Sequence, residues 1–221
     1  MKKALIIFAR YPELGKVKTR LAKTIGNEKA LSIYKELLLH THSITKDISP
    51  DKFVFLAEPE LGKDFPVWDH PINSFTIRIQ EGNTLGERML HAFQALFANG
   101  YDHVCIIGSD CITLTQINIT EAFSQLKYHD AVIGPSVDGG YYLLGMKKPH
   151  SMLFENKEWS TDKVFASTIE DLRLTHLSFH LLPVLSDIDT EEQVTNEKII
   201  ASTGGLQLWK RILCLYSILC F

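Results

Sequence analysis

The stretch Val104-Cys-Ile-Ile-Gly-Ser-Asp110 decides how this chain is interpreted. A short apolar run ends abruptly in Gly-Ser-Asp, which is typical of a strand buried on both faces of a parallel sheet. Ligands of open α/β sheets bind just beyond the carboxyl ends of such strands. A carboxylate at this position, Asp110, suits Mg²⁺, which is usually held by one or two carboxylates and substrate phosphates. The alternative is that Asp110 only caps the helix that follows.

Strand and helix patterns alternate on both sides of this stretch. We expect strands at residues 4–9, 52–57, 75–79, 103–107, 130–134, 141–146 and 180–185. We expect helices at residues 27–46, 85–97, 115–126, 161–172 and 190–200, with Asn27 capping the first. This alternation predicts an α/β fold, a three-layer α/β/α sandwich around a mostly parallel sheet.

Length and composition narrow the class of protein. The 221 residues suit one domain at 1–202, followed by an apolar tail at 203–221. We expect the tail to be a packed helix, with a homodimer contact or a membrane-surface helix as alternatives. A net charge of −3 argues against nucleic acid as a partner. Four cysteines without metal spacing, and no apolar run long enough for a signal peptide or a membrane span, favour a cytoplasmic protein.

The loop after the first predicted strand is rich in cations. Arg10, Lys16, Lys18 and Arg20 lie around Gly15, and Thr19 can begin a short helix. Cations beside a glycine turn and a helix start form an anion cradle, in which arginine makes bidentate phosphate contacts. The pattern is not a Walker A loop. We expect phosphate binding here, and a solvated basic loop is the alternative.

A second loop, Gln80-Glu-Gly-Asn-Thr-Leu-Gly-Glu-Arg-Met89, joins a predicted strand to a predicted helix. Thr84 is the expected cap, with Glu87 as its capping-box partner. Arg88 lies at the same edge of the sheet as Asp110 and can reach a base, ribose or phosphate. Ser109, beside Asp110, is assigned with Arg88 to the nucleotide.

Three further segments carry candidate residues. In Asp138-Gly-Gly-Tyr141 the glycines let a ligand approach closely, so Asp138, Gly139, Gly140 and Tyr141 are expected on the acceptor side. A hairpin with Asp-Gly chemistry is the alternative.

Asp187 and Asp189 follow another apolar run and alternate along it, so that either can complete a metal site with Asp110. Helix capping is the alternative for both. Trp159, in a loop near a helix start, can stack on a ligand.

Together these segments resemble the bacterial "transferase 1, radical-SAM/selenodomain-associated" family of the glycosyltransferase-A superfamily. The resemblance covers residues 1–200 and rests on Phe8-Ala-Arg-Tyr-Pro, Gly15-Lys-Val-Lys-Thr-Arg-Leu21, Leu85-Gly-Glu-Arg-Met89, Ile107-Gly-Ser-Asp-Cys111, Asp138-Gly-Gly-Tyr-Tyr-Leu-Leu-Gly145, Trp159-Ser-Thr161 and Asp187-Ile-Asp-Thr190. It implies a nucleotide-diphospho-sugar transferase fold in which Asp110 holds Mg²⁺ or Mn²⁺ with the nucleotide and Asp189 supplies a second ligand.

Three functions follow as hypotheses. The first is a metal-dependent glycosyltransferase with a nucleotide-sugar donor, in which Asp138 positions the acceptor or acts as its general base. The second is a nucleotidyltransferase that releases pyrophosphate from a nucleoside triphosphate. The third is a nucleotide-binding protein without turnover, which the missing glycosyltransferase Asp-x-Asp keeps open, because residue 108 is Gly108.

Overall fold

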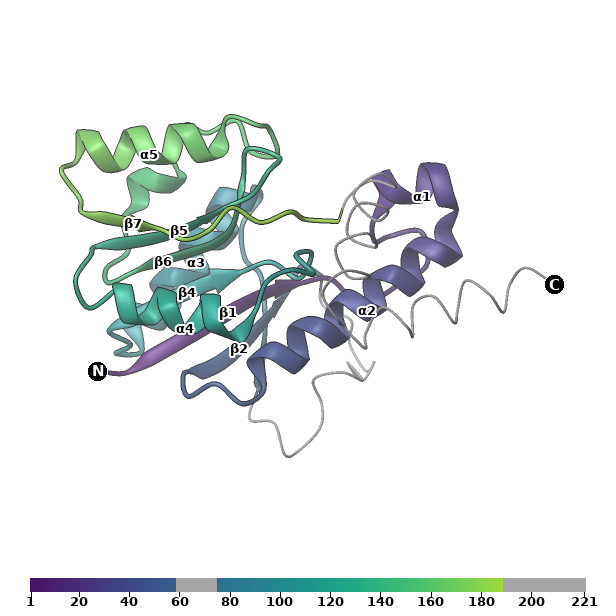
Figure 1. The fold of residues 1–221 in the computed structure, drawn as a ribbon, viewed down its shortest axis with the longest axis horizontal. Coiled ribbons are helices and arrows are strands. Elements are labelled where there is room, and N and C mark those ends of the chain that lie inside the picture. Colours follow the sequence, from purple (N-terminus) through teal and green to yellow (C-terminus); the bar gives the residue numbers. More distant parts are fainter. Residues whose placement is uncertain (59–74, 189–221) are drawn as a thin grey trace.

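The computed structural model describes residues 1–58 and 75–188 (Figure 1). Its strands are β1 (Lys3–Ala9), β2 (Asp51–Leu56), β3 (Phe75–Ile79), β4 (His103–Ile107), β5 (Ala131–Pro135), β6 (Tyr141–Met146) and β7 (Phe179–Leu181). Its helices are α1 (Thr19–Ile25), α2 (Asn27–Thr45), α3 (Leu85–Ala98), α4 (Gln116–Gln125) and α5 (Val164–Leu174), with a short 3₁₀ helix, η1, at Ser151–Phe154. The predicted helix at 190–200 and the tail at 203–221 lie outside the described residues.

The strands form a mixed, mostly parallel sheet in the order β3-β2-β1-β4-β6-β5-β7. Strands β1 to β4 run parallel to one another, and β7 runs parallel to β5. Only β6, among these strands, is antiparallel to its neighbours β4 and β5. The parallel core explains why β1 and β4 read as continuous apolar runs, since both of their faces are buried.

Helices cover both faces of the sheet, which confirms the predicted three-layer sandwich. Side chains of β1 alternate between two cores: Leu5 and Ile7 face α2 and α4, whereas Ala4 and Ile6 face α3, η1 and α5. Figure 1 shows α2 and α4 on the near side of the sheet and α3 behind it. The short α1 packs against α2 through Leu21, away from the sheet.

One predicted helix cap and one predicted helix start were wrong. Helix α2 is capped by Gly26, with φ 84°, and Asn27 is its first helical residue with no capping side-chain bond. Helix α5 begins at Val164 rather than at residue 161, because residues 161–163 form a turn, in which the Thr161 hydroxyl donates to the carbonyl oxygen of Glu158 at 2.6 Å. The Thr84 cap of α3 is confirmed, since its hydroxyl accepts a hydrogen bond from the Glu87 N–H at 3.1 Å.

No helix within the two described ranges is both long and apolar enough to cross a membrane.

Candidate functional site

A cavity of about 830 Å³ opens at the edge of the sheet where β1 and β4 end. Twelve of the residues that the sequence singled out line it: Arg10, Lys16, Lys18, Arg20, Arg88, Ser109, Asp110, Asp138, Gly140, Tyr141, Trp159 and Asp187. They come from six separate segments of the chain, which the strand order brings to one edge. Gly139 is not part of the cavity lining, and Asp189 lies outside the described residues.

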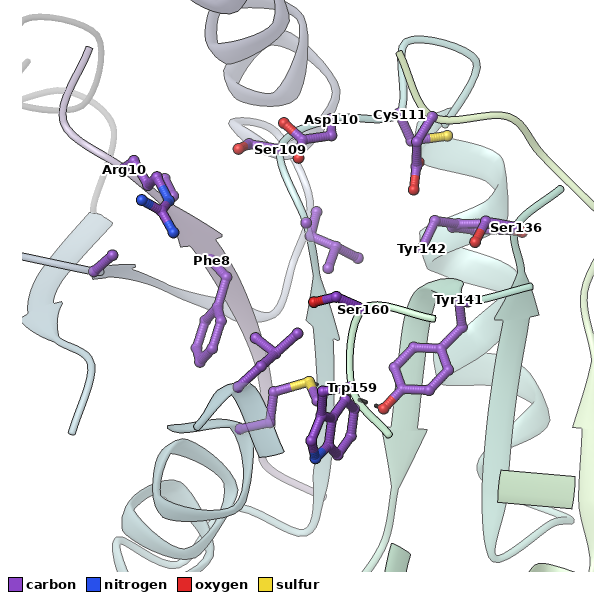
Figure 2. Close-up of a pocket in the computed structure, with 18 of the residues that line it drawn as sticks. Phe8, Arg10, Ser109, Asp110, Cys111, Ser136, Tyr141, Tyr142, Trp159 and Ser160 are labelled. Atoms are coloured by element: carbon purple, nitrogen blue, oxygen red, sulfur yellow. Dashed lines mark hydrogen bonds between the residues drawn. The ribbon is translucent and has the colours of Figure 1, made fainter. Parts of the chain in front are cut away.

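The cavity has a charged end and an aromatic end. Figure 2 shows Arg10, Ser109 and Asp110 around one part of it and Phe8, Tyr141 and Trp159 around another. Side chains that suit phosphate and metal are therefore separated from side chains that suit the face of a ring.

The loop after β1, residues 10–20 and here called the basic loop, contributes four cations to the charged end. Lys16 pairs with Glu13 at 3.1 Å, and Lys18 places its Nζ 3.0 Å from Oδ1 of Asp110. Arg10 and Arg20 are exposed on the cavity wall. The loop therefore offers a phosphate group several cations within one cavity, two of which are already engaged by carboxylates.

Asp110 is held at the end of β4 by its backbone. Its carbonyl oxygen accepts a hydrogen bond from the N–H of Ile188 at 3.0 Å, which brings the segment carrying Asp187 alongside it. Both carboxylates line the cavity. Hard oxygen donors of this kind fit Mg²⁺ or Mn²⁺. Within residues 1–58 and 75–188, no group of three or more metal-ligating side chains forms. Two carboxylates nevertheless suffice when substrate phosphates complete the coordination shell.

Tyr34 of α2 also lines the cavity, although it belongs to none of the sequence motifs above. Its hydroxyl accepts a hydrogen bond from the N–H of Arg10 at 2.8 Å and lies 3.1 Å from the Arg10 carbonyl oxygen. It also lies 3.5 Å from Oγ of Ser109. Burial, and then the Asp110 carboxylate, raise the pKa of Tyr34 to about 12, so the hydroxyl stays neutral. Tyr34 thus ties the end of β1 to the end of β4.

Cys111, the neighbour of Asp110 in the chain, is buried in the core at 5% exposure. Burial, and then Asp187, raise the pKa of its thiol to about 12. A thiol that stays protonated is a poor nucleophile.

Asp138 builds the turn between β5 and β6. Its Oδ1 accepts hydrogen bonds from the Ser136 hydroxyl and from the Gly140 N–H, the latter at 3.0 Å. The hairpin alternative therefore describes the local structure, and the same carboxylate still borders the cavity. Gly139 serves the turn instead of the cavity, because its carbonyl accepts the N–H of Phe165 at 2.8 Å.

Trp159 and Gly86 connect two segments that look independent in the sequence. A Cβ built on Gly86 would stand 2.4 Å from Nε1 of Trp159, so the indole lies directly on the first turn of α3. On its other side the indole stacks against Phe154 at 6.5 Å between ring centroids. The glycine of Leu85-Gly-Glu-Arg88 is therefore needed to hold the tryptophan that walls the aromatic end.

Tyr141 and Arg88 complete this side of the cavity. The Tyr141 hydroxyl contacts the sulfur of Met89 at 3.9 Å, a weak acceptor, and burial raises the pKa of the phenol. The Arg88 Nε donates to the carbonyl oxygen of Gly82 at 2.9 Å, which fixes the guanidinium at the cavity wall. Arg88 keeps its Nη groups as donors for a ligand, and the single Tyr141 proton, held only by a weak sulfur acceptor, can be redirected to a ligand.

The Gly86–Trp159 contact predicts that substitutions at these two positions have strongly non-additive effects on the free energy of unfolding. Gly86→Ala is expected to displace the indole and lower the free energy of unfolding by about 2 kcal/mol, because overpacking forces neighbours to move. Chemical denaturation measures the loss. In a Trp159→Ala background the same glycine substitution should cost little, and Gly108→Ala, which meets no atom within 4 Å, is the matched control. Equal losses in both backgrounds would contradict the contact.

Comparisons with known proteins agree with this architecture. The family model described as "Uncharacterized protein conserved in bacteria (DUF2064)" matches residues 42–161. No curated protein matches the chain. A candidate nucleotide-diphospho-sugar transferase from Desulfovibrio desulfuricans G20 superposes with a TM-score of 0.85 and 32% identity, over 96% of this chain and 91% of that one.

More distant structures share the fold alone. The 4-diphosphocytidyl-2C-methyl-D-erythritol synthase of Anaerococcus prevotii DSM 20548 has a TM-score of 0.59 at 11% identity, covering 88% of this chain and 93% of its own. Rv0371c of Mycobacterium tuberculosis H37Rv, in complex with manganese, has a TM-score of 0.53 at 9% identity, covering 89% and 97%. The sheet, the match over residues 42–161 and the similarity over nearly the whole chain have one explanation: the chain belongs to the DUF2064 family and has a nucleotide-diphospho-sugar transferase fold.

Proposed function

We propose that this protein is a metal-dependent transferase that uses a nucleotide-diphospho-sugar as its donor. The observation that carries the proposal is the charged end of the cavity, where the basic loop meets Asp110 and Asp187. Cations that bind phosphates and carboxylates that bind a divalent metal are the two components that a nucleoside diphosphate leaving group requires. The similarity to the candidate sugar transferase of Desulfovibrio supports the same donor class.

The residues divide into roles by their position. Lys16, Lys18 and Arg20 hold the diphosphate, with Arg10 and Ser109 at the ends of β1 and β4 beside it. Asp110 and Asp187 hold the metal, together with Asp189 as a proposed third ligand. When bound, Mg²⁺ or Mn²⁺ neutralises the charge that develops on the departing diphosphate.

The other end of the cavity is assigned to the acceptor. Trp159 and Tyr141 offer a ring face and a hydroxyl donor, while Arg88 borders the nucleotide. Oδ1 of Asp138 accepts the hydrogen bonds of the turn, so the other carboxylate oxygen, Oδ2, accepts the proton of the acceptor nucleophile. The nucleophile forms a bond to the anomeric carbon as the bond from that carbon to the phosphate oxygen breaks, and the nucleoside diphosphate leaves. A cavity of about 830 Å³ has room for both substrates.

Nucleotidyl transfer is the second candidate, and the number of cations favours it. Four basic side chains from one loop line the cavity, which matches the roughly fourfold negative charge of a nucleoside triphosphate. The Anaerococcus synthase, whose name contains a diphosphocytidyl group, shares the fold. In this reaction the acceptor attacks the α-phosphorus and pyrophosphate leaves.

A thermal-shift panel of nucleotides and nucleotide sugars, each with and without Mn²⁺, tests the proposal, because a ligand that binds the folded state raises its apparent stability. A metal-dependent shift with a nucleoside diphosphate or its sugar is expected. A shift confined to triphosphates, followed by pyrophosphate release, would favour nucleotidyl transfer. Binding without a product for any donor and acceptor would indicate a nucleotide-binding protein without turnover.

Charge reversal in the basic loop tests phosphate binding directly. Lys16→Glu combined with Arg20→Glu is expected to weaken nucleotide binding by about 100-fold or more, because two attractive contacts become repulsive. Isothermal titration measures the affinity. The same reversal at Lys23 and Lys29, exposed residues outside the cavity lining, is the control. Unchanged affinity in the loop variant would contradict the phosphate cradle.

A further inference from the structure

We propose that the ammonium group of Lys18 occupies the place beside Asp110 that the divalent metal takes when phosphates bind. The metal therefore enters efficiently only with the nucleotide, whose phosphates draw Lys18 away from the carboxylate. This inference rests on the proposed function, because it specifies how the metal and the donor reach the same site.

The geometry of the ion pair is the first support. The Lys18 Nζ lies 3.0 Å from Oδ1 of Asp110, and the lysine side chain is only 4% exposed whereas the Asp110 side chain is 45% exposed. An ammonium group with so little access to water needs an anion beside it. Asp110 supplies that anion, and its more exposed carboxylate lines the cavity, where a metal ion can reach it.

The backbone of Lys18 is the second support. Lys18 precedes α1 in the left-handed conformation, with φ 47° and ψ 43°, and its carbonyl oxygen accepts the N–H of Ala22 at 2.8 Å. Val17 and Leu21 on either side are buried at 3% and 1% exposure. The main chain is therefore anchored in a conformation that non-glycine residues rarely adopt. Because the anchor fixes the backbone, only the side chain can move between two anionic partners.

The neighbouring cations indicate where the second partner is. Lys16 and Arg20 belong to the same loop and line the same cavity as Lys18. Phosphates bound among these three cations give the Lys18 ammonium a new counter-ion and release the Asp110 oxygen. A divalent ion and an ammonium group on one carboxylate repel each other. Phosphates that draw Lys18 away therefore raise the affinity for the metal, and the metal raises the affinity for the phosphates by the same factor.

Lys18→Met separates this role from a structural one, because it keeps a long, apolar side chain and removes the charge. On the full chain, without nucleotide, we expect Mn²⁺ to bind about tenfold tighter to the variant than to the wild type. We expect inorganic pyrophosphate, titrated without metal, to bind about tenfold more weakly. Paramagnetic resonance of bound Mn²⁺ and titration calorimetry measure the two affinities, and neither depends on turnover.

Matched variants make the result specific. Lys23→Met removes an exposed charge from α1, the helix that Lys18 precedes, outside the cavity lining, and is expected to leave both affinities within about twofold. Asp110→Asn, combined with Lys18→Met, should abolish the gain in Mn²⁺ affinity. Lys18→Gln is the second neutral variant if Lys18→Met does not fold, as judged by circular dichroism.

Opposite changes in the two affinities support the proposal, since loss of structure would weaken both. Mn²⁺ binding that is unchanged or weaker in the neutral variants overturns it and leaves the proposed function standing. A wild type that binds no Mn²⁺, with or without pyrophosphate, contradicts the metal-dependent function and this inference together.

Discussion

Asp110→Asn is expected to abolish metal-dependent binding of the nucleotide and to lower turnover by about 1,000-fold, the scale of losing one preorganised electrostatic group at a reacting centre. The amide keeps the size of the carboxylate and loses its charge, so a divalent ion lacks its principal ligand. Lys16 and Arg20 remain, and binding of the nucleotide without metal should change by only about threefold. Titration with and without Mn²⁺ measures both effects.

Two comparisons make this result interpretable. Asp47→Asn removes a carboxylate that is 74% exposed and lies outside the cavity lining, so it should leave Mn²⁺ and nucleotide binding unchanged. A thermal melt tests whether Asp110→Asn folds, because the substitution also removes a charged partner of the nearly buried Lys18 ammonium. A folded Asp110→Asn protein with wild-type dependence on Mn²⁺ would contradict the assignment of the metal to this residue.

Gly139→Ala is the second large effect and acts on stability. Gly139 has a φ of +85°, and a Cβ built on it would stand 2.1 Å from the carbonyl oxygen of Asp162. The substitution combines left-handed strain with a backbone clash, and we expect it to lower the free energy of unfolding by about 3–5 kcal/mol. Denaturant unfolding followed by circular dichroism measures the loss.

Gly100→Ala isolates the two causes. Gly100 has a similar φ of +78° but meets no atom within 4 Å of the added Cβ, so only the strain remains. We expect a loss of about 1–2 kcal/mol there. Equal losses at the two glycines would show that the loop at Asp162 yields easily and that the hairpin does not hold it in place.

The consequence of the Gly139 contact extends to the site. The carbonyl oxygen of Gly139 accepts the N–H of Phe165 in the first turn of α5. The loop that precedes α5 carries Trp159, which rests on Gly86. Two close approaches of backbone therefore fix the wall of the aromatic end between the β5–β6 turn and α3. Gly86 and Gly139 must stay small because a Cβ at either position would collide with Trp159 or Asp162, not because they contact a ligand.

Local patterns were enough to predict the architecture. Apolar runs such as Val104–Ile107 and the periodic face of α3 depend only on neighbours in the chain, because strand and helix periodicities are local. The rule that ligands bind where parallel strands end then placed Asp110 at the cavity before any tertiary contact was known. The start of α5 was misplaced because residues 161–163 form a turn that packs against Gly139, a contact that local periodicity does not report.

The sequence by itself thus determined the order of strands and helices along the chain, the three-layer sandwich and twelve of the residues that line the cavity. Only the tertiary structure decided which of them touch. The Tyr34 hydroxyl lies beside the hydroxyl of Ser109, 75 positions away in the sequence. The Trp159 indole packs on Gly86, and Lys18 forms an ion pair with Asp110. Such contacts depend on how helices and loops dock on the sheet, and docking is fixed by packing between distant residues, which leaves no periodic signal in the chain.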